Sequence, residues 1–492
     1  MSVLVIDAGT TGVTALVVGP DTAVQSRGYR EFPQHFPQSG WVEHSPDEIW
    51  TATLDAARDA LATAPSTPTC VGITNQRETV VLWDRETLSS PRPAIVWQDR
   101  RTSGMCEQLR QDGHERIVRS TTGLRLDPYF SATKLAWIQN NEPHIWAGVT
   151  AGRTAIGTID SYLVARMSRG LHHITDVSNA SRTLLFDIHG GAWSADLCAL
   201  FGVPMDALPT VVASYGELGH TDPACFLGLD LPISGIAGDQ QAALFGQCAF
   251  APGDAKCTYG TGSFVLVNTG SQAVDSHAGL LTTVAVGAPD GTLTYALEGS
   301  VFVTGAAIQW LRDGLGVIEA AHEVNDLAAS VPDAGGVVFV PALAGLGAPD
   351  WDPSARGVIV GITRGTTAGH LARATLDAIA FQVRDVVDLM VAEASVSLPT
   401  LAVDGGASAS DLLCQLQADQ LGVPVLRPEV IETTGLGAAF LAGLGSGMWA
   451  SQDELAASRR IERTFAPGRR DENAHRLWRA AVERAKGWAL ET

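Results

Sequence analysis

The chain has 492 residues, a formal net charge of −20 at neutral pH, 46% apolar residues and 17% charged residues. This composition is typical of a globular protein and excludes a disordered chain, and the length allows two to four domains. The negative charge opposes binding to nucleic acids and to anionic membranes. No stretch approaches 18 uncharged apolar residues, and the first apolar run is broken by Asp7 and lacks a basic leader. We therefore expect neither a signal peptide nor a membrane span.

Residues 3–18 form the first predicted element, two β-branched apolar runs joined by a turn of small residues. The pattern predicts a β-hairpin. Gly12 allows a ligand to approach the backbone closely, and Thr10 and Thr11 add hydroxyl groups on the side of Asp7. Such a turn suits phosphate oxygens, with the carboxylate reaching a bound Mg²⁺. By itself the motif is weak, because most Gly-Thr turns between strands are only turns.

Asp239 places one carboxylate at the start of an apolar run, residues 239–247, that is predicted to be helical. An acid in this position either caps the helix or faces a ligand while the helix supports it. In an arbitrary sequence the cap is the better interpretation. The other motifs of this chain reverse that preference.

Residues 256–268 repeat the pattern of strand, Gly-Thr-Gly turn and strand, with Thr261 in the turn. Two such hairpins, about 250 residues apart and each opening one half of the chain, predict duplicated α/β halves that face each other across a cleft. The phosphates of a nucleotide would then be held from both sides. We expect a first domain at residues 1–247 and a second at residues 248–492.

Residues 401–410 predict a buried strand that runs into glycines, followed by a helix that begins near Asp411. The backbone of such a loop can approach a flat ring. In isolation an ordinary strand-to-helix connection is the better interpretation.

The tail at residues 458–491 alternates charges and carries Trp478 and Trp488 at helical spacing. This pattern predicts a terminal helix packed on one face, with a partner-binding helix as the less favoured alternative.

Together these elements resemble the FGGY carbohydrate kinases of the actin, hexokinase and Hsp70 superfamily, and within them the branch that phosphorylates glycerol. The resemblance implies an α/β fold of two ribonuclease-H-like (actin-like ATPase) domains that face each other across a nucleotide and substrate cleft. It covers nearly the whole chain. Its most specific stretches are residues 41–44, 72–79, 97–102, 127–134, 279–283, 308–312 and 345–353.

The resemblance implies that the chain phosphorylates glycerol to sn-glycerol 3-phosphate with ATP, with Asp239 as the general base. The implied polyol-binding residues are Arg77, Glu78, Trp97, Tyr129, Asp239, Gln240 and Phe264. The implied nucleotide-binding residues are Thr10, Thr11, Gly12, Thr261, Gly305, Gln309, Gly406 and Ser410. Asp7 and Asp239 are implied as the ligands of Mg²⁺.

Two departures from the family pattern leave alternatives open. Thr14 stands where the family usually has Arg near the nucleotide phosphates, and Ser410 stands where Asn is usual in the adenine loop. Both favour a catalytically weak nucleotide-binding or regulatory relative, whereas the intact Asp7 and Asp239 oppose it. A kinase for another small polyol or ketose is the second alternative.

Seven cysteines are scattered along the chain without a C-x-x-C motif or the spacing of a metal site. We interpret them as reduced thiols of a cytoplasmic protein. The sequence does not determine the oligomeric state, and a homo-oligomer is compatible with it.

Overall fold

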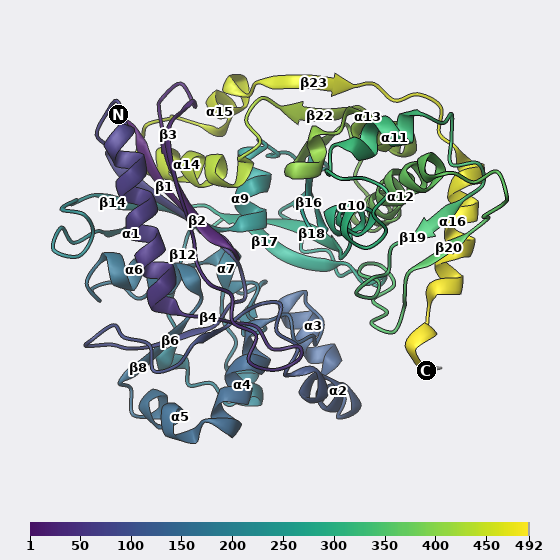
Figure 1. The fold of residues 1–492 in the computed structure, drawn as a ribbon. Helices are drawn as coiled ribbons and strands as arrows, with labels where there is room; N and C mark the ends of the chain where they lie inside the picture. The colour runs from purple at the N-terminus through teal and green to yellow at the C-terminus, as the bar shows by residue number, and fades with distance from the viewer. Residues whose placement is uncertain (491–492) are drawn as a thin grey trace.

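The first half of the chain is built around a six-stranded sheet. A computed structural model describes residues 1–490 and is shown as a ribbon in Figure 1. The strand order is β13-β14-β5-β1-β2-β3, with β1, β5 and β14 parallel and the other strands antiparallel to their neighbours. The strands are β1 (Val3–Ala8), β2 (Gly12–Val18), β3 (Val24–Glu31), β5 (Cys70–Asn75), β13 (Tyr215–His220) and β14 (Pro232–Gly238).

The second half repeats this sheet with one added strand. Its order is β17-β18-β16-β15-β21-β22-β23, and β15, β21 and β22 are parallel, as β1, β5 and β14 are in the first sheet. The predicted duplication of two α/β halves is therefore confirmed at the level of strand connectivity. The strands are β15 (Ala255–Tyr259), β16 (Ser263–Gly270), β17 (Leu281–Gly287), β18 (Leu293–Val301), β21 (Leu401–Asp404), β22 (Val425–Pro428) and β23 (Ile461–Phe465).

Short strand pairs and helices complete the fold. The pairs are β4 (Glu43–His44) with β7 (Ala94–Ile95), β6 (Val81–Asp84) with β8 (Thr154–Gly157), β9 (Ile174–Asp176) with β12 (Thr210–Val212), β10 (Phe186–Asp187) with β11 (Ala192–Trp193), and β19 (Val338–Val340) with β20 (Val358–Val360). The helices of the first half are α1 (Pro46–Thr63), α2 (Ser103–Gln111), α3 (Glu115–Thr122), α4 (Ser131–Asn141), α5 (Pro143–Thr150), α6 (Ile159–Met167), α7 (Val177–Ala180), α8 (Ala195–Phe201) and α9 (Asp239–Gly246). Those of the second half are α10 (Gly305–Asp313), α11 (Glu323–Ala329), α12 (Ala368–Ala394), α13 (Asp411–Leu421), α14 (Thr433–Gly445), α15 (Gln452–Ser458) and α16 (Glu472–Ala485).

Helix α14 belongs to the second half in sequence but packs on the first sheet, against β14, β5 and β1, and on α9 (Figure 1). Its run of small residues makes this close packing possible, because a Cβ on Gly437 would overlap the carbonyl oxygen of Ala242 in α9. Gly246 is equally restricted by the carbonyl oxygen of Thr433. The chain thus crosses between the halves more than once. A single domain boundary between residues 247 and 248 therefore stays a prediction.

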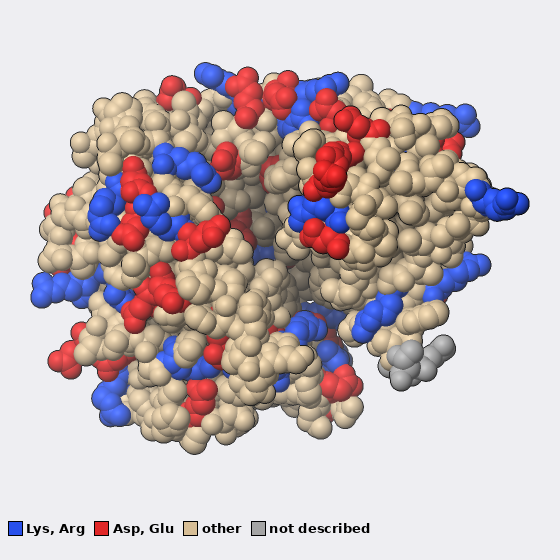
Figure 2. All heavy atoms as spheres, viewed as in Figure 1, with Lys and Arg blue, Asp and Glu red and all other residues tan. Residues whose placement is uncertain are grey.

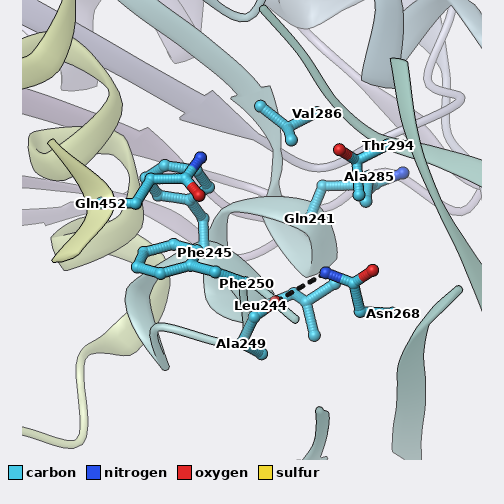
Figure 3. A pocket seen from close by; sticks show the side chains of 10 residues that line it. All are labelled: Gln241, Leu244, Phe245, Ala249, Phe250, Asn268, Ala285, Val286, Thr294 and Gln452. Atoms are coloured by element: carbon cyan, nitrogen blue, oxygen red, sulfur yellow. Dashed lines mark hydrogen bonds between the residues drawn. The ribbon is translucent and has the colours of Figure 1, made fainter. Parts of the chain in front are cut away.

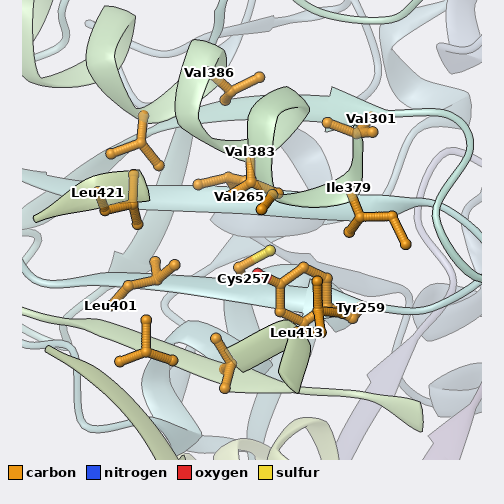
Figure 4. Packing of buried hydrophobic residues seen from close by; sticks show 14 of the residues in the cluster. Cys257, Tyr259, Val265, Val301, Ile379, Val383, Val386, Leu401, Leu413 and Leu421 are labelled. Atoms are coloured by element: carbon orange, nitrogen blue, oxygen red, sulfur yellow. The ribbon is translucent and has the colours of Figure 1, made fainter. Parts of the chain in front are cut away.

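Each half has its own apolar core. In the second half α12 packs on β16 and β18, and α13 packs on β22. Val383 of α12 and Leu413 of α13 belong to the same core cluster as Cys257, Tyr259 and Val265 (Figure 4). The apolar alternation of the strands and the apolar stripe of α12 explain this packing. The core holds β15 and β21 rigidly, so the loops at their ends have a fixed position.

The prediction of a continuous terminal helix is wrong in part. Residues 461–465 form strand β23, which pairs antiparallel with β22, and α16 begins only at Glu472. Trp478 is buried as expected, whereas Trp488 is 57% exposed. The physical reason is that Ile461 and Phe465 lie at the even spacing of a strand, and that the edge of the second sheet supplies the hydrogen-bonding partner.

On the face seen in Figure 2 the acidic and basic side chains are interspersed, and the surface is hollowed between the two halves. Within residues 1–490 no helix combines the length and the apolar character needed to cross a membrane. All seven cysteines are free thiols.

Candidate active site

The candidate site lies where the parallel strands of the two sheets end. Asp7 is the second-last residue of β1, Arg77 follows β5, and Asp239 follows β14. Because β1, β5 and β14 are parallel neighbours, their carboxyl ends meet at one edge of the first sheet. Ligands of open α/β sheets bind at this kind of edge. The tertiary fold therefore brings together three side chains that are far apart in sequence.

Arg77 is the centre of the residues that were predicted to bind a polyol. Its side chain is 2% exposed, and its Nε lies 3.1 Å from Oδ1 of Asp239. Nη2 donates to the hydroxyl of Tyr129 at 3.2 Å, and Nη1 and Nη2 donate to Glu298 at 2.5 and 3.1 Å. Nε is also 3.8 Å from the carboxylate of Glu78. The structure thus places four predicted residues, Arg77, Glu78, Tyr129 and Asp239, in one connected cluster.

Glu78 has an unusual backbone conformation, with φ at 62°. A non-glycine residue in the left-handed region is strained and persists only where its surroundings hold it. Arg182 donates to its carboxylate at 2.7 Å, and Ser131 donates to its carbonyl oxygen at 3.0 Å. These two contacts hold the buried acid in this conformation, next to Arg77 at the end of β5.

Asp239 is the first residue of α9 and not its N-cap, which is Gly238. Its side chain is 30% exposed, although its neighbours in the cluster are buried. Burial raises the pKa of its carboxyl group, and the charges of Arg77 and Lys256 oppose that shift. A partly exposed carboxylate at a helix N-terminus with a raised pKa has the properties of a general base.

The aromatic residues of the predicted polyol site also lie at this cluster. The ring of Trp97 meets the ring of Tyr129 edge to face at a centroid distance of 5.6 Å, and its Nε1 donates to Oγ1 of Thr10 at 2.9 Å. Phe264 of β16 lies 6.0 Å from the guanidinium of Arg77. Trp97 therefore joins the first hairpin turn to the polyol residues, and Phe264 contributes a wall from the second half.

The side chain of Gln240 contacts a lysine of the second half, and its contact with a polyol stays a prediction. Its side-chain oxygen accepts a hydrogen bond from Nζ of the buried Lys256, which also donates to Thr258 at 2.8 Å. Gln240 is thus held toward the second hairpin rather than toward Arg77. Its backbone N–H donates to Oδ1 of Asp239 at 2.7 Å, so it contacts the site through its main chain.

The second hairpin turn and the start of α10 form one continuous backbone surface. The N–H of Gly305 donates to the carbonyl oxygen of Gly260 at 3.0 Å, and the N–H groups of Thr304 and Ala306 donate to that of Thr261 at 2.9 and 3.1 Å. A Cβ on Gly305 would lie 2.7 Å from the oxygen of Gly260, so only glycine fits here. Thr261 itself is exposed and available to a ligand.

The remaining residues that were predicted to bind a nucleotide do not form one hydrogen-bonded group with the second hairpin turn. Thr11 and Gln309 are exposed, and Gly406 faces open space after β21. Gly12 is covered by the ring of Tyr29. The hydroxyl of Ser410 caps α13 by accepting from the N–H of Leu413 at 3.0 Å, and it also bonds to Asn325. Ser410 therefore has a structural role, and its contact with a nucleotide stays a prediction.

Asp7 has the properties of a ligand for a divalent cation. Its carboxylate has no hydrogen bond or ion pair to any of residues 1–490. Burial, and secondarily the charge of Asp239, raise its pKa to about 7. A carboxylate without a cationic partner, beside the second carboxylate of Asp239, fits Mg²⁺, which binds one or two protein carboxylates and takes its other ligands from phosphates and water. Within the described chain no group of three or more His, Cys, Asp or Glu side chains is placed to hold a metal.

Three buried charged residues were missed at the sequence level. Glu298 and Arg182 are 0% exposed and belong to the Arg77 cluster, and Lys256 is 0% exposed beside Gln240. Burial alone would raise the pKa of Glu298, but the charges of Arg182 and Arg77 outweigh it and hold the pKa at about 2. One sequence signal could have identified Glu298 as a buried charge. It is the only charged residue in the otherwise apolar strand pattern of residues 293–301.

His44 supports the first phosphate turn from behind. Its Nε2 donates to Gln34, whose amide donates to the carbonyl oxygen of Thr10 at 2.6 Å. Gln76 donates both to Nδ1 of His44 at 3.3 Å and to the carbonyl oxygen of Gly9 at 3.0 Å. Only the neutral imidazole can donate at one nitrogen and accept at the other. Burial, and then the neighbouring His35, lower the pKa of His44 to about 4.

We expect the first domain to lose about 2 kcal/mol of stability between pH 7 and pH 5 through His44 alone. The unfolded histidine, with a pKa near 6.5, takes up a proton in this range, whereas the folded one does not. The stabilisation is therefore complete above the unfolded pKa and is lost as the pH falls toward 4. Urea unfolding at the two pH values measures this loss, which His44→Gln should abolish. His220→Gln on exposed β13 is the control, and a wild-type slope in His44→Gln would contradict the prediction.

A small cavity behind α9 is not part of the substrate site. Its volume is about 30 Å³, and it is lined by Gln241, Leu244 and Phe245 of α9 together with residues of the second sheet and Gln452 (Figure 3). This volume accommodates about one water molecule. None of the predicted polyol or nucleotide residues lines this cavity.

The fold and the site are those of a two-domain sugar or polyol kinase, and the chain belongs to the FGGY family of carbohydrate kinases. Residues 2–246 match the N-terminal domain of that family, and residues 255–446 match its C-terminal domain.

Full-length relatives lie within one branch of this family. The chain is 54% identical to the glycerol kinase of Aromatoleum aromaticum over 491 residues and 54% identical to that of Trichlorobacter lovleyi over 493 residues, with 99% of each chain covered in both cases. Among solved structures, Plasmodium falciparum glycerol kinase with ADP superposes with a TM-score of 0.92 at 34% identity and covers 98% of both chains. A xylulose kinase from Lactobacillus acidophilus, at 19% identity and a TM-score of 0.87, shares the fold.

Proposed function

We propose that the protein is a glycerol kinase, which transfers the terminal phosphoryl group of ATP to glycerol and yields sn-glycerol 3-phosphate and ADP. The observation that carries this proposal is the connected cluster of Arg77, Asp239 and Tyr129 at the end of the first sheet, with Phe264 opposite. Polar groups converge there beside aromatic walls, as a small polyol requires. The full-length similarity to glycerol kinases supports the same substrate.

In the proposed reaction Arg77 and Glu78 hold two hydroxyl groups of glycerol, and Tyr129 contributes a further hydrogen bond. The terminal hydroxyl oxygen forms a bond to the γ-phosphorus while the bond from that phosphorus to the bridging β-γ oxygen breaks. Asp239 accepts the hydroxyl proton, and ADP leaves with the bonding electrons. This protein supplies position and charge complementarity, which is most of what phosphoryl transfer needs.

On the nucleotide side, Thr10, Thr11 and Thr261 are proposed to contact phosphate oxygens through their hydroxyl and N–H groups. Gly305 and Gly406 would leave room for the rest of the nucleotide. Asp7 and Asp239 would hold Mg²⁺, which when bound neutralises phosphate charge. The exposed Thr11 and Thr261 support this proposal, because both hairpin turns offer a hydroxyl group to a ligand.

A coupled assay of ADP formation with MgATP and a series of polyols and ketoses tests the proposal. Glycerol is expected to give the highest kcat/KM, because Trp97 and Tyr129 leave little width beside Arg77. A pentulose or tetritol with a higher kcat/KM would show that the substrate assignment is wrong.

Thr14 provides a second test of the nucleotide side. It is paired directly with Asp7 across β1 and β2, so the two side chains lie on the same face of the sheet. Thr14→Arg would add a cation beside the proposed phosphate turn, where a charge-assisted hydrogen bond contributes about 1.5–3 kcal/mol. We expect a lower KM for MgATP or a higher kcat, with little change in the KM for glycerol.

Steady-state kinetics measure this effect, and Thr22→Arg at the far end of the β2–β3 hairpin is the matched control. If both variants remain folded and have the same nucleotide parameters, position 14 does not approach the phosphates.

A further inference from the structure

Glu298 is a fully buried carboxylate of β18, in the second sheet, that contacts two arginines of the first half. Its Oε2 accepts from Nη1 of Arg77 at 2.5 Å. Its Oε1 accepts from Nη2 of Arg77 at 3.1 Å and from Nη2 of Arg182 at 2.9 Å. Both arginines are at most 2% exposed. This is a charged contact between the halves of the chain, placed directly behind the proposed polyol site.

The surrounding contacts form a closed set of alternating charges. Arg182 links Glu298 to Glu78 through its Nε, at 2.7 Å, and Arg77 lies between the same two carboxylates. Two guanidinium groups and two carboxylates therefore balance one another. Asp239 is the third carboxylate of the cluster, with Lys256 as a further cation nearby, and its side chain remains 30% exposed.

Glu298 also determines which atoms of Arg77 remain for other partners. Because the carboxylate takes Nη1 and Nη2 in a two-point contact, the guanidinium plane is fixed, and Nε is directed to Asp239 at 3.1 Å. Gln241 reinforces this orientation by accepting from Nη1 at 3.1 Å, while its amide donates to Thr283 of β17 at 2.9 Å. The second sheet thus holds Arg77 through two side chains.

We infer that Glu298 is a positioning residue for polyol binding: from the second half it fixes the guanidinium of Arg77 in the orientation that binds the hydroxyl groups of the substrate. This inference rests on the proposed function. It adds that an acid of the second half orients a binding group of the first, since Arg77, Glu78, Tyr129 and Asp239 all belong to the first half.

Glu298→Gln keeps the size of the side chain and removes its charge. The two guanidinium groups then share Glu78, and Asp239 becomes the nearest free carboxylate for Arg77. Arg77 is expected to turn toward Asp239 and away from Tyr129. Misplacement of a binding group by about 1 Å can cost up to about 100-fold, so we expect the KM for glycerol to rise about 10- to 100-fold. The KM for MgATP should stay within about threefold, because Glu298 has no contact with either hairpin turn.

Two further variants complete the experiment. Glu298→Asp keeps the charge but shortens the side chain, so it should fold even if the glutamine variant does not, and it should raise the KM for glycerol because it cannot reach both arginines. Glu432→Gln removes an acid of the second half that pairs with Arg27 of the first at 3.9 Å on an exposed surface. This control should leave both KM values unchanged.

A purely structural role of Glu298 would lower the melting temperature without separating the two KM values. The inference is overturned if the folded Glu298→Gln and Glu298→Asp variants bind glycerol within threefold of the wild type. The activity of the wild-type protein on glycerol is measured first. If the wild type does not phosphorylate glycerol, that result counts against the proposed function and not against the role of Glu298. A crystal structure of the glutamine variant then decides the inference independently: an Arg77 guanidinium within about 0.5 Å of its wild-type position would contradict it.

Discussion

Replacement of Asp239 by asparagine is expected to lower kcat by about 10²- to 10⁴-fold, the usual cost of removing a general base. The amide has the size of the carboxylate and keeps one oxygen for Nε of Arg77, which lies 3.1 Å away. It cannot accept the proton of the attacking hydroxyl. We therefore expect a folded protein whose KM for glycerol changes by no more than about fivefold.

Steady-state kinetics with glycerol measure this effect, and Asp230→Asn, whose side chain is 75% exposed, is the control. Titration with MgADP separates the two roles proposed for Asp239, because loss of a metal ligand weakens nucleotide binding and loss of the base does not. A kcat within threefold of the wild type would exclude Asp239 as the base.

Arg77→Met is expected to have the largest effect on stability. The substitution keeps an unbranched apolar side chain of related length but leaves Glu298 and Asp239 without the guanidinium that pairs with both. Removal of one partner of a buried ion pair costs about 3–5 kcal/mol, because the remaining charge stays buried. In a domain of this size that corresponds to a fall in melting temperature of roughly 6–20 °C.

Calorimetry of the wild type and the variant measures this change. Arg30→Met is the matched control, since Arg30 pairs with Asp59 on the surface and both side chains are more than 40% exposed. Surface pairs contribute little, so its melting temperature should be nearly that of the wild type. Equal melting temperatures for the two variants would mean that the buried charge cluster does not stabilise the fold.

These two variants also separate stability from chemistry at one site. Asp239 is the partly exposed member of the cluster, and its replacement should change turnover while the fold persists. Arg77 is the buried member, with contacts to both halves, and its replacement should change both properties. Since Glu298 joins the cluster from the second sheet, the stability of each half depends in part on the other.

The sequence alone determined the local elements and the positions of several candidate site residues. Glycine and threonine between apolar runs predicted both hairpins, and the structure confirms them as β1–β2 and β15–β16. These signals are local, because a turn between two short strands depends on nearby residues and on their alternation. For the same reason the strand at residues 401–404 and the helix that begins at Asp411 could be predicted.

Only the tertiary structure decided which distant side chains meet. The sequence did not indicate that Glu298 and Arg182 complete the Arg77 cluster, that Gln240 turns toward Lys256, or that α14 returns to the first sheet. Nor did it reveal β23, whose pairing with β22 depends on a sheet edge formed by other segments. A buried charge is stable only beside its partners, and Glu298 lies more than 100 residues from Arg77 in the chain. The place of such a charge therefore depends on how the sheets pack and not on the residues around it in the sequence.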